Sequence, residues 1–377
     1  MALADLHLRT HTARNALVVI AVVVAGAAFF WLSGILTPLA LALFLLVMID
    51  SFARVLVKRV PHFPAVLAQP AAIALAVGLV ILTIVVVADN ATAFAGQTNV
   101  YLPKLNALVG GLAAAMGMAN HPTAQQLINQ LNPSSYIGVA ADHLKGFATT
   151  AVAVLLYLGF LIASRQSFPR KAAKLFVSPE TRHEAAEMFQ RIRNGVERYL
   201  WVQVVCGTMM AIPAFIVMTA IGLDNAVFWA FLIFIVGFIP IIGGAIGVLG
   251  PPLFALVQFD KPWRALILLG ALEVMGFIIG NIIYPRMQGK SLNIDPIAVL
   301  LSLAFWGAIW GLPGMFLSTP LTVMAMIILA QFDGSRWIAI LLSSDGDPLG
   351  PTASVSAPGD PATAALPGPG ATVLAQP

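Results

Sequence analysis

The sequence predicts an all-α integral membrane protein, and three observations support this fold class. Of the 377 residues, 59% are hydrophobic and only 10% are charged, whereas an ordinary soluble domain carries about 25% charged residues. The mean hydropathy is +0.91. Several apolar segments reach the roughly 20 residues that a helix needs to cross a hydrocarbon core. We therefore expect about eight transmembrane helices, with two Gly/Pro-broken helical elements in the second half.

The first half contains four apolar spans. They are residues 16–32, 35–49, 65–88 and 147–164. Only Ser33 and Gly34 separate the first two spans, which predicts a tight helical hairpin. Basic residues precede the first span and follow the second, so the positive-inside rule places both flanks in the cytoplasm.

The connections around the fourth span differ in character. Residues 89–145 are rich in Asn, Gln, Gly and Pro with few charges, and we expect an extracytoplasmic insert of short amphipathic helices. Residues 165–199 are dense in Arg and Lys, which predicts a basic cytoplasmic segment. Within it, Ser178 and Pro179 form the N-cap and first position of a helix. This amphipathic helix should continue directly into a fifth span, residues 200–221.

The second half contains two long apolar runs that are interrupted by glycine and proline. They are residues 226–259 and 297–329, with a straight span at 263–283 between them. No single straight helix fits such a composition. Each run predicts two half-length helices folded around the break, either as a re-entrant hairpin or as a long kinked span. Hairpins would place the loop 285–296 in the cytoplasm, whereas kinked spans would place it outside.

Broken helices at membrane depth are the feature that bears most on function. Backbone groups freed from the helix must be buried in protein or line a water-filled cavity, and paired discontinuous helices hold the substrate in many secondary transporters. Alternatively, the small residues only permit close helix packing. We expect the residues around the breaks to shape a transport path. They are Pro240, Gly243, Gly244, Gly247, Asn281, Pro285, Gly289, Pro313, Gly314 and Pro320.

Glu273 lies near the middle of the span 263–283. An acidic side chain at that depth costs a few kcal/mol on insertion scales, so some interaction must offset the cost. One interpretation is a protonatable residue that faces a cavity and contacts or couples the substrate. The other is a protonated Glu that is hydrogen-bonded to a neighbouring helix. The first predicts that Glu273→Gln reduces flux without impairing membrane insertion.

The motifs give no indication of an enzyme. All six histidines lie outside the apolar spans, and there is no H-E-x-x-H motif. The sequence Gly289-Lys290-Ser291 is similar to the end of a P-loop, but Tyr284 stands where the leading glycine should be. We therefore assign no catalytic residue, no metal ligand and no cofactor.

Charge distribution indicates the partners. The basic residues form short clusters between apolar runs, so the sequence pI of about 9.4 reflects membrane topology and not nucleic-acid binding. The expected partners are the lipid bilayer and a small-molecule or ion substrate. From residue 344 the chain consists mostly of Pro, Gly, Ala and Ser, which predicts a disordered cytoplasmic tail over 344–377 and a polytopic membrane domain over 1–343.

Several motifs are similar to those of the autoinducer-2 exporter-like family of bacterial permeases. They are Phe238–Gly243 (FIPIIG), Asn281–Leu292 (NIIYPRMQGKSL), the Trp-Gly and Pro-Gly pairs within Phe305–Leu321, and Arg336–Ala339. The resemblance implies a homo-oligomeric inner-membrane permease of about eight spans that exports a small solute such as autoinducer-2, a quorum-sensing signal. Many members carry an acidic residue just before the Asn at position 281, where this chain has Ile279-Gly280.

Three functions remain open at this point. The first is a secondary or facilitated transporter whose path lies between the two broken elements. The second is a sodium/proton-type cation antiporter, in which Glu273 alternately binds a proton and a cation. The third is a non-transporting membrane scaffold, whose insert or basic segment binds partners.

Overall fold

The computed structural model describes residues 20, 23–96, 101, 103–104, 106–107, 110, 133–175, 178–288 and 293–348. Apart from one isolated β-bridge between Ile294 and Ser343, the regular structure of this part is helical, which confirms the predicted fold class. In chain order the elements are α2 (Ser33–Arg59), α3 (Ala65–Gly96), α6 (Pro133–Ser164), η1 (Arg165–Ser167), α7 (Phe168–Leu175), α8 (Pro179–Ile221), α9 (Ala226–Val236), α10 (Ile242–Gln258), α11 (Trp263–Ile278), η2 (Ile279–Ile283), α12 (Tyr284–Gln288), α13 (Pro296–Leu329) and α14 (Arg336–Leu342).

Six helical segments in the described part of the chain are long and apolar enough to cross a membrane. They are Ser33–Arg59, Ala65–Asn90, Lys145–Ser164, Pro179–Ile221, Trp263–Met287 and Pro296–Leu329. Two shorter apolar helices, α9 and α10, fill the predicted broken run at 226–259. The chain is therefore a multi-pass membrane protein. Much of the insert 89–145, and the tail from residue 349 onward, lie outside the described residues.

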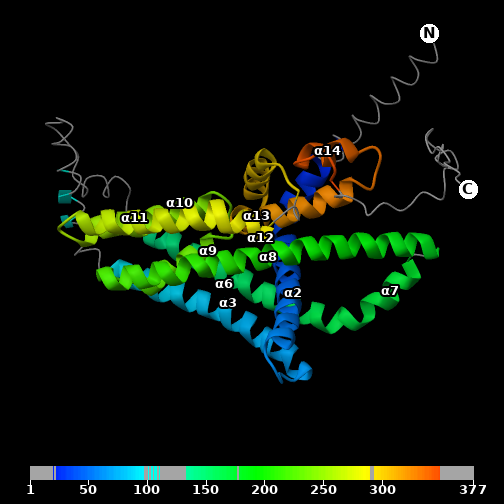
Figure 1. The fold of residues 1–377 in the computed structure, drawn as a ribbon, viewed down its shortest axis with the longest axis horizontal. Coiled ribbons are helices and arrows are strands. Elements are labelled where there is room, and N and C mark those ends of the chain that lie inside the picture. The colour runs from blue at the N-terminus through cyan, green and yellow to red at the C-terminus, as the bar shows by residue number, and fades with distance from the viewer. Residues whose placement is uncertain are drawn as a thin grey trace, which may run out of the picture.

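Helix α8 organises the molecule. It begins as expected, because Ser178 accepts a hydrogen bond from the Thr181 backbone N–H at 3.1 Å and Pro179 occupies the first turn. It then runs for 43 residues and ends at Gly222, whose φ of 82° is left-handed. Figure 1 shows α8 spanning most of the length of the molecule, and α7 leads into its basic end. The predicted amphipathic helix and fifth span are thus one continuous helix.

The expected hairpin at Ser33-Gly34 is not formed. Ser33 and Gly34 are the first residues of α2, and only Leu32 separates α2 from the helical residues 23–31. Helical backbone hydrogen bonds from Leu32 to Ala28 and from Leu36 to Leu32 cross this point. Glycine in a helix costs only about 1 kcal/mol, which a long apolar helix can absorb.

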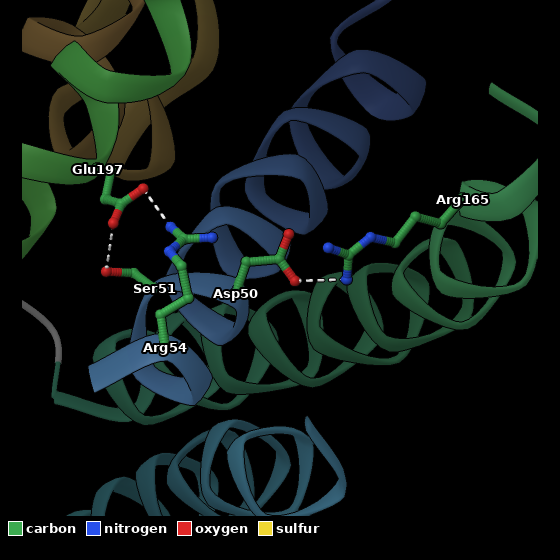
Figure 2. A network of polar contacts seen from close by, with 5 residues as sticks. All are labelled: Asp50, Ser51, Arg54, Arg165 and Glu197. Carbon is green, nitrogen blue, oxygen red and sulfur yellow. Dashed lines mark hydrogen bonds and ion pairs between the residues drawn. The ribbon is translucent and has the colours of Figure 1, made fainter. Parts of the chain in front are cut away.

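We call the side of the molecule that carries Arg54, Arg165 and Arg198 the basic side. Ion pairs connect α2 to its neighbours at this side: Arg165 of η1 contacts Asp50 at 2.6 Å, and Arg54 contacts Glu197 of α8 (Figure 2). Arg198 of α8 also donates a 3.3 Å hydrogen bond to the carbonyl of Met287. Met287, near the end of α12, therefore lies at the basic side.

The opposite side is defined by the other end of α8. Gln258, at the end of α10, donates to the carbonyl of Gly222 at 2.9 Å and accepts from the backbone N–H of Asp224 at 2.8 Å. Two described residues of the predicted insert also lie here: Tyr101 donates to Asp224 at 3.3 Å and Lys104 to the carbonyl of Gln258 at 2.6 Å. Burial and the Asp224 carboxylate raise the pKa of Tyr101, which keeps its hydroxyl protonated as the donor.

Candidate functional site

The first broken run is a re-entrant hairpin, made of α9 and α10. Its arms run antiparallel, because a Cβ at Gly247 would meet the side chain of Ile233 at 3.6 Å and one at Gly250 would meet Trp229 at 2.8 Å. The arms approach most closely at the tip, where a Cβ at Gly243 would lie 2.0 Å from the Val236 carbonyl oxygen. Both ends of this hairpin lie at the opposite side, so its tip points into the molecule.

The tip of the first hairpin is a tight, strained turn. The Ile242 N–H donates to the Pro240 carbonyl at 2.7 Å, and Ile241 between them has φ 66° and ψ −56°. These angles are those of the classic γ-turn, which is rare in proteins. A β-branched residue at positive φ is an outlier, and such strain persists only where the surroundings enforce it.

Helix α8 supports this tip by two hydrogen bonds. Gln203 donates to the carbonyl of Gly237 at 2.8 Å and Tyr199 donates to that of Phe238 at 3.3 Å. These carbonyls have lost their helical partners at the break, and at membrane depth each must find another donor. The side chain of Phe238 stacks on Phe316 of α13, with ring centroids 4.8 Å apart.

The second broken run is also a re-entrant hairpin, although its arms form one element, α13. Gly311 is the break, with φ 64° and ψ −142°. The Trp306 indole N–H donates to the Thr322 hydroxyl at 3.1 Å, whereas 16 residues of straight helix would separate them by about 24 Å. After the turn, a Cβ at Gly314 would lie 2.0 Å from the Trp306 carbonyl oxygen.

The second hairpin enters from the basic side. Asp295 caps its first arm by accepting from the Ile297 N–H at 2.8 Å, and the Asp295 N–H donates to the carbonyl of Leu342 at 3.0 Å. α14 thus returns to the point where α13 began. Each broken run folds back on itself, so the chain adopts the hairpin alternative of the sequence analysis. The two hairpins enter from opposite sides.

A cavity of about 800 Å³ lies beside the first hairpin. Its walls come from α8, the first hairpin, the end of α11 with η2, the start of the second hairpin's first arm, and Thr319 of its second arm. Most of the wall is apolar or glycine, and the polar side chains that line it come from six residues: Gln203, Tyr284, Asn293, Thr319, Ser344 and Asp345. The cavity extends from residues of the basic side to the tip of the first hairpin.

At the basic side, the residues after α14 line the cavity. Asn293 donates to the Asp345 carboxylate at 2.6 Å and to the carbonyl of Asp347 at 2.7 Å, and Ser344 donates to the Asn293 side-chain oxygen at 2.5 Å. Ser344 and Asp345 belong to the segment expected to be a tail. Their contacts place the first residues of that segment against the membrane domain.

Four of the expected path residues line the cavity, and they all belong to the first hairpin: Pro240, Gly243, Gly244 and Gly247. The others lie elsewhere. Asn281 and Pro285 are exposed on η2 and α12, and Gly314 and Pro320 are buried in the second hairpin beside the half-buried Pro313. Gly289 lies outside the described residues.

Glu273 is exposed on α11 and does not line the cavity. Gly276, one turn later, is the first residue of α11 to reach it, followed by Ile279 and Gly280. The π-helical turn η2 begins at Ile279, and such turns often occur at functional sites. The π-helical turn rotates the residues after Ile279 relative to those of α11. Residues on the same face as Glu273 in an ideal α-helix therefore need not share its surroundings in this segment.

Gln203 lies in the predicted fifth span, and its hydrogen bond to Gly237 connects two helical elements. Sequence reasoning missed Thr319, Asn293, Ser344 and Asp345 as lining residues. Nothing in their local sequence distinguishes them from loop or helix residues. Within the described ranges, no three His, Cys, Asp or Glu side chains are grouped so that they could hold a metal ion.

Two re-entrant hairpins of opposite entry, with a cavity beside the tip of the first, are an arrangement typical of membrane transport proteins. The family model described as "AI-2E family transporter" matches residues 17–334, and the chain belongs to this family.

Individual relatives agree with this assignment. The chain is 28% identical to the AI-2 transport protein TqsA of Escherichia coli K12 over 314 residues, which is 82% of this chain and 89% of that protein. It is 26% identical to a Haemophilus influenzae protein over 89% of this chain and 97% of the relative. A Borreliella burgdorferi protein is 32% identical over 59% of this chain and 61% of the relative. The names of both also describe transport proteins.

Proposed function

We propose that this protein exports a small solute by a secondary or facilitated mechanism, and that the solute passes through the cavity beside the first hairpin. The observation that carries the proposal is the cavity itself, which leads from the basic side to a strained hairpin tip. By the positive-inside rule the basic side is cytoplasmic, so a solute would enter from the cytoplasm of a bacterial inner membrane.

The cavity suits a small molecule. A volume of about 800 Å³ falls within the roughly 300–1,000 Å³ of ligand pockets, which are also mostly apolar with a few placed polar groups. Autoinducer-2 is the substrate to test first, because the relative TqsA is named for its transport. A cation antiporter has less support, since among the described residues that line the cavity the only carboxylate is that of Asp345 at the basic side.

A matched pair of glycine variants tests the route. Gly244 lines the cavity, and a Cβ there would meet nothing within 4 Å, so Gly244→Leu should fold normally and project its side chain into the space. Gly270 on α11 is equally open but does not line the cavity, and Gly270→Leu is the control. In proteoliposomes loaded with autoinducer-2, we expect Gly244→Leu to lower flux about tenfold or more, since it obstructs the path.

The result separates route from substrate. Flux of autoinducer-2 in the wild type that is retained in Gly244→Leu would overturn the proposed route. Absence of autoinducer-2 flux in the wild type, with or without a proton gradient, would withdraw this substrate. Equal loss in both variants would show that a bulky residue on either helix disturbs the fold, and the cavity would then have no support.

A further inference from the structure

A second hollow lies on the basic side, between α2 and α8, and it is separate from the transport cavity. Its volume is about 560 Å³, and most of the residues that line it are polar or charged. Three arginines contribute to the wall, Arg54 from α2 and Arg193 and Arg198 from α8, together with Ser51, Glu197 and Trp201. None of these residues lines the transport cavity.

The charges in this hollow leave an excess of positive charge. Both oxygens of Glu197 are engaged: one accepts from Ser51 at 3.0 Å and the other pairs with Arg54 (Figure 2). Glu197 also interacts electrostatically with Arg193, so its single negative charge is set against three guanidinium groups. Among the described residues, neither Arg193 nor Arg198 forms an ion pair, and the hydrogen bond from Arg198 to Met287 goes to an uncharged carbonyl.

The depth of the hollow in the membrane follows from its neighbours. Arg198 directly precedes the apolar stretch 200–221 of α8, so it lies where the hydrocarbon core ends. Trp201 lines the hollow one turn further along, and tryptophan is enriched at the level of lipid headgroups. The anionic lipids of the cytoplasmic leaflet attract basic residues at this level.

We propose that this hollow binds a phosphate group, and that the phosphate belongs to an anionic phospholipid of the leaflet at the basic side. Arginine is suited to this role because its planar guanidinium offers five donors in a fork that matches phosphate oxygens. Arg198 uses one nitrogen for Met287 and keeps others for a ligand. A bound headgroup would therefore bridge α2 and α8. Arg198 would connect it to Met287 of α12, the helix whose Tyr284 lines the transport cavity.

The test uses the full-length protein, purified in neutral detergent, and measures binding of phosphatidylglycerol, phosphatidylcholine and inorganic phosphate by native mass spectrometry and by the shift in thermal unfolding. We expect Arg193→Gln and Arg198→Gln each to weaken phosphatidylglycerol binding about fivefold, because one basic residue near the surface contributes about 1 kcal/mol. Arg191→Gln removes the same charge from an exposed position of α8 outside the hollow, and this control should bind like the wild type.

Each result has a defined meaning. Equal weakening in Arg191→Gln and the two hollow variants would overturn the site, because a general charge effect would then explain the binding. Inorganic phosphate that binds as well as the lipid, and is lost in the same variants, would support the phosphate site and overturn the lipid as its source. If a Gln variant does not fold, Arg193→Lys keeps the charge without the fork, and unchanged affinity in that variant would overturn the proposed recognition by a guanidinium.

Discussion

The two re-entrant hairpins solve the same backbone problem in different surroundings. In each, a glycine just after the turn abuts a carbonyl of the other arm, at positions 243 and 314, and a Cβ at either would lie 2.0 Å from that oxygen. The tip of the first hairpin borders the cavity, with an exposed Ile241. The second hairpin is a central part of the core, where Leu317 and Ser318 are fully buried. The same close packing of a glycine against a backbone carbonyl thus occurs in a hairpin that lines the cavity and in a hairpin that forms part of the rigid interior.

The turns themselves also differ. The second hairpin turns at Gly311 with φ 64°, and the first at Ile241 with φ 66°. Glycine adopts positive φ without steric penalty, whereas a residue with a Cβ pays roughly 1–2 kcal/mol. The buried hairpin therefore has the relaxed turn, and the hairpin beside the cavity has the strained one. We therefore expect substitutions at the tip of the first hairpin to affect transport more than substitutions at the tip of the second.

The largest expected effect is that of Gly314→Ala. The new Cβ would meet the Trp306 carbonyl inside the core, where neither arm can move, and overpacking of this kind costs roughly 3 kcal/mol or more. We expect most of the protein to be lost as aggregate in detergent, measured by size-exclusion chromatography of a fluorescent fusion. Gly159→Ala on α6, where a Cβ meets nothing within 4 Å, should behave like the wild type.

The matching change in the first hairpin is Gly243→Ala, and it tests the comparison directly. The clash with Val236 is as close, but the tip borders a cavity into which it can relax. We expect a smaller loss of stability, about 1–2 kcal/mol, in a protein that still folds but transports poorly. If Gly243→Ala and Gly314→Ala destabilise the protein equally, the two hairpins are equally rigid and the comparison fails.

Trp306→Phe should have an intermediate effect. It removes the indole N–H that donates to Thr322 across the second hairpin and leaves a buried hydroxyl without its donor, a loss of about 1–3 kcal/mol. The midpoint of thermal unfolding should fall accordingly while flux per folded molecule stays the same. Reduced flux at unchanged stability would mean that the second hairpin moves during transport, contrary to its role as a fixed element.

Ile241→Gly is expected to change stability in the other direction. Its side chain is 59% exposed, so little packing is lost, and relief of the positive φ should raise stability by about 1 kcal/mol. Ile246→Gly is the control, because Ile246 is also exposed but lies within α10, where glycine should destabilise by about 1 kcal/mol. A fall in unfolding temperature for Ile241→Gly would show that the turn is not strained.

The sequence allowed most apolar helices and the two breaks of the second half to be predicted, because apolar length, Gly and Pro are local signals. The same signals wrongly predicted a turn at Ser33-Gly34, which lies inside a helical segment. Whether the chain turns back at each break or continues across the membrane was not predictable, since a re-entrant hairpin and a kinked span have the same composition. Asp345 and Thr319 were missed for a related reason: their place in the cavity wall depends on contacts between distant segments, such as that between Asn293 and Asp345. Glycine was the most informative residue type, because Gly243 and Gly314 occupy positions where a Cβ would clash with the other arm of the hairpin.

The smallest expected effect concerns Glu273, whose role the sequence left open. Its side chain is exposed on α11 and lies one turn before the part of that helix that lines the cavity. From this position we expect Glu273→Gln to change flux less than twofold, measured in proteoliposomes with and without a proton gradient. Loss of gradient-dependent flux in Glu273→Gln, at wild-type expression, would favour the antiporter alternative. The outer face of α11, and not the difference between the hairpins, would then control transport.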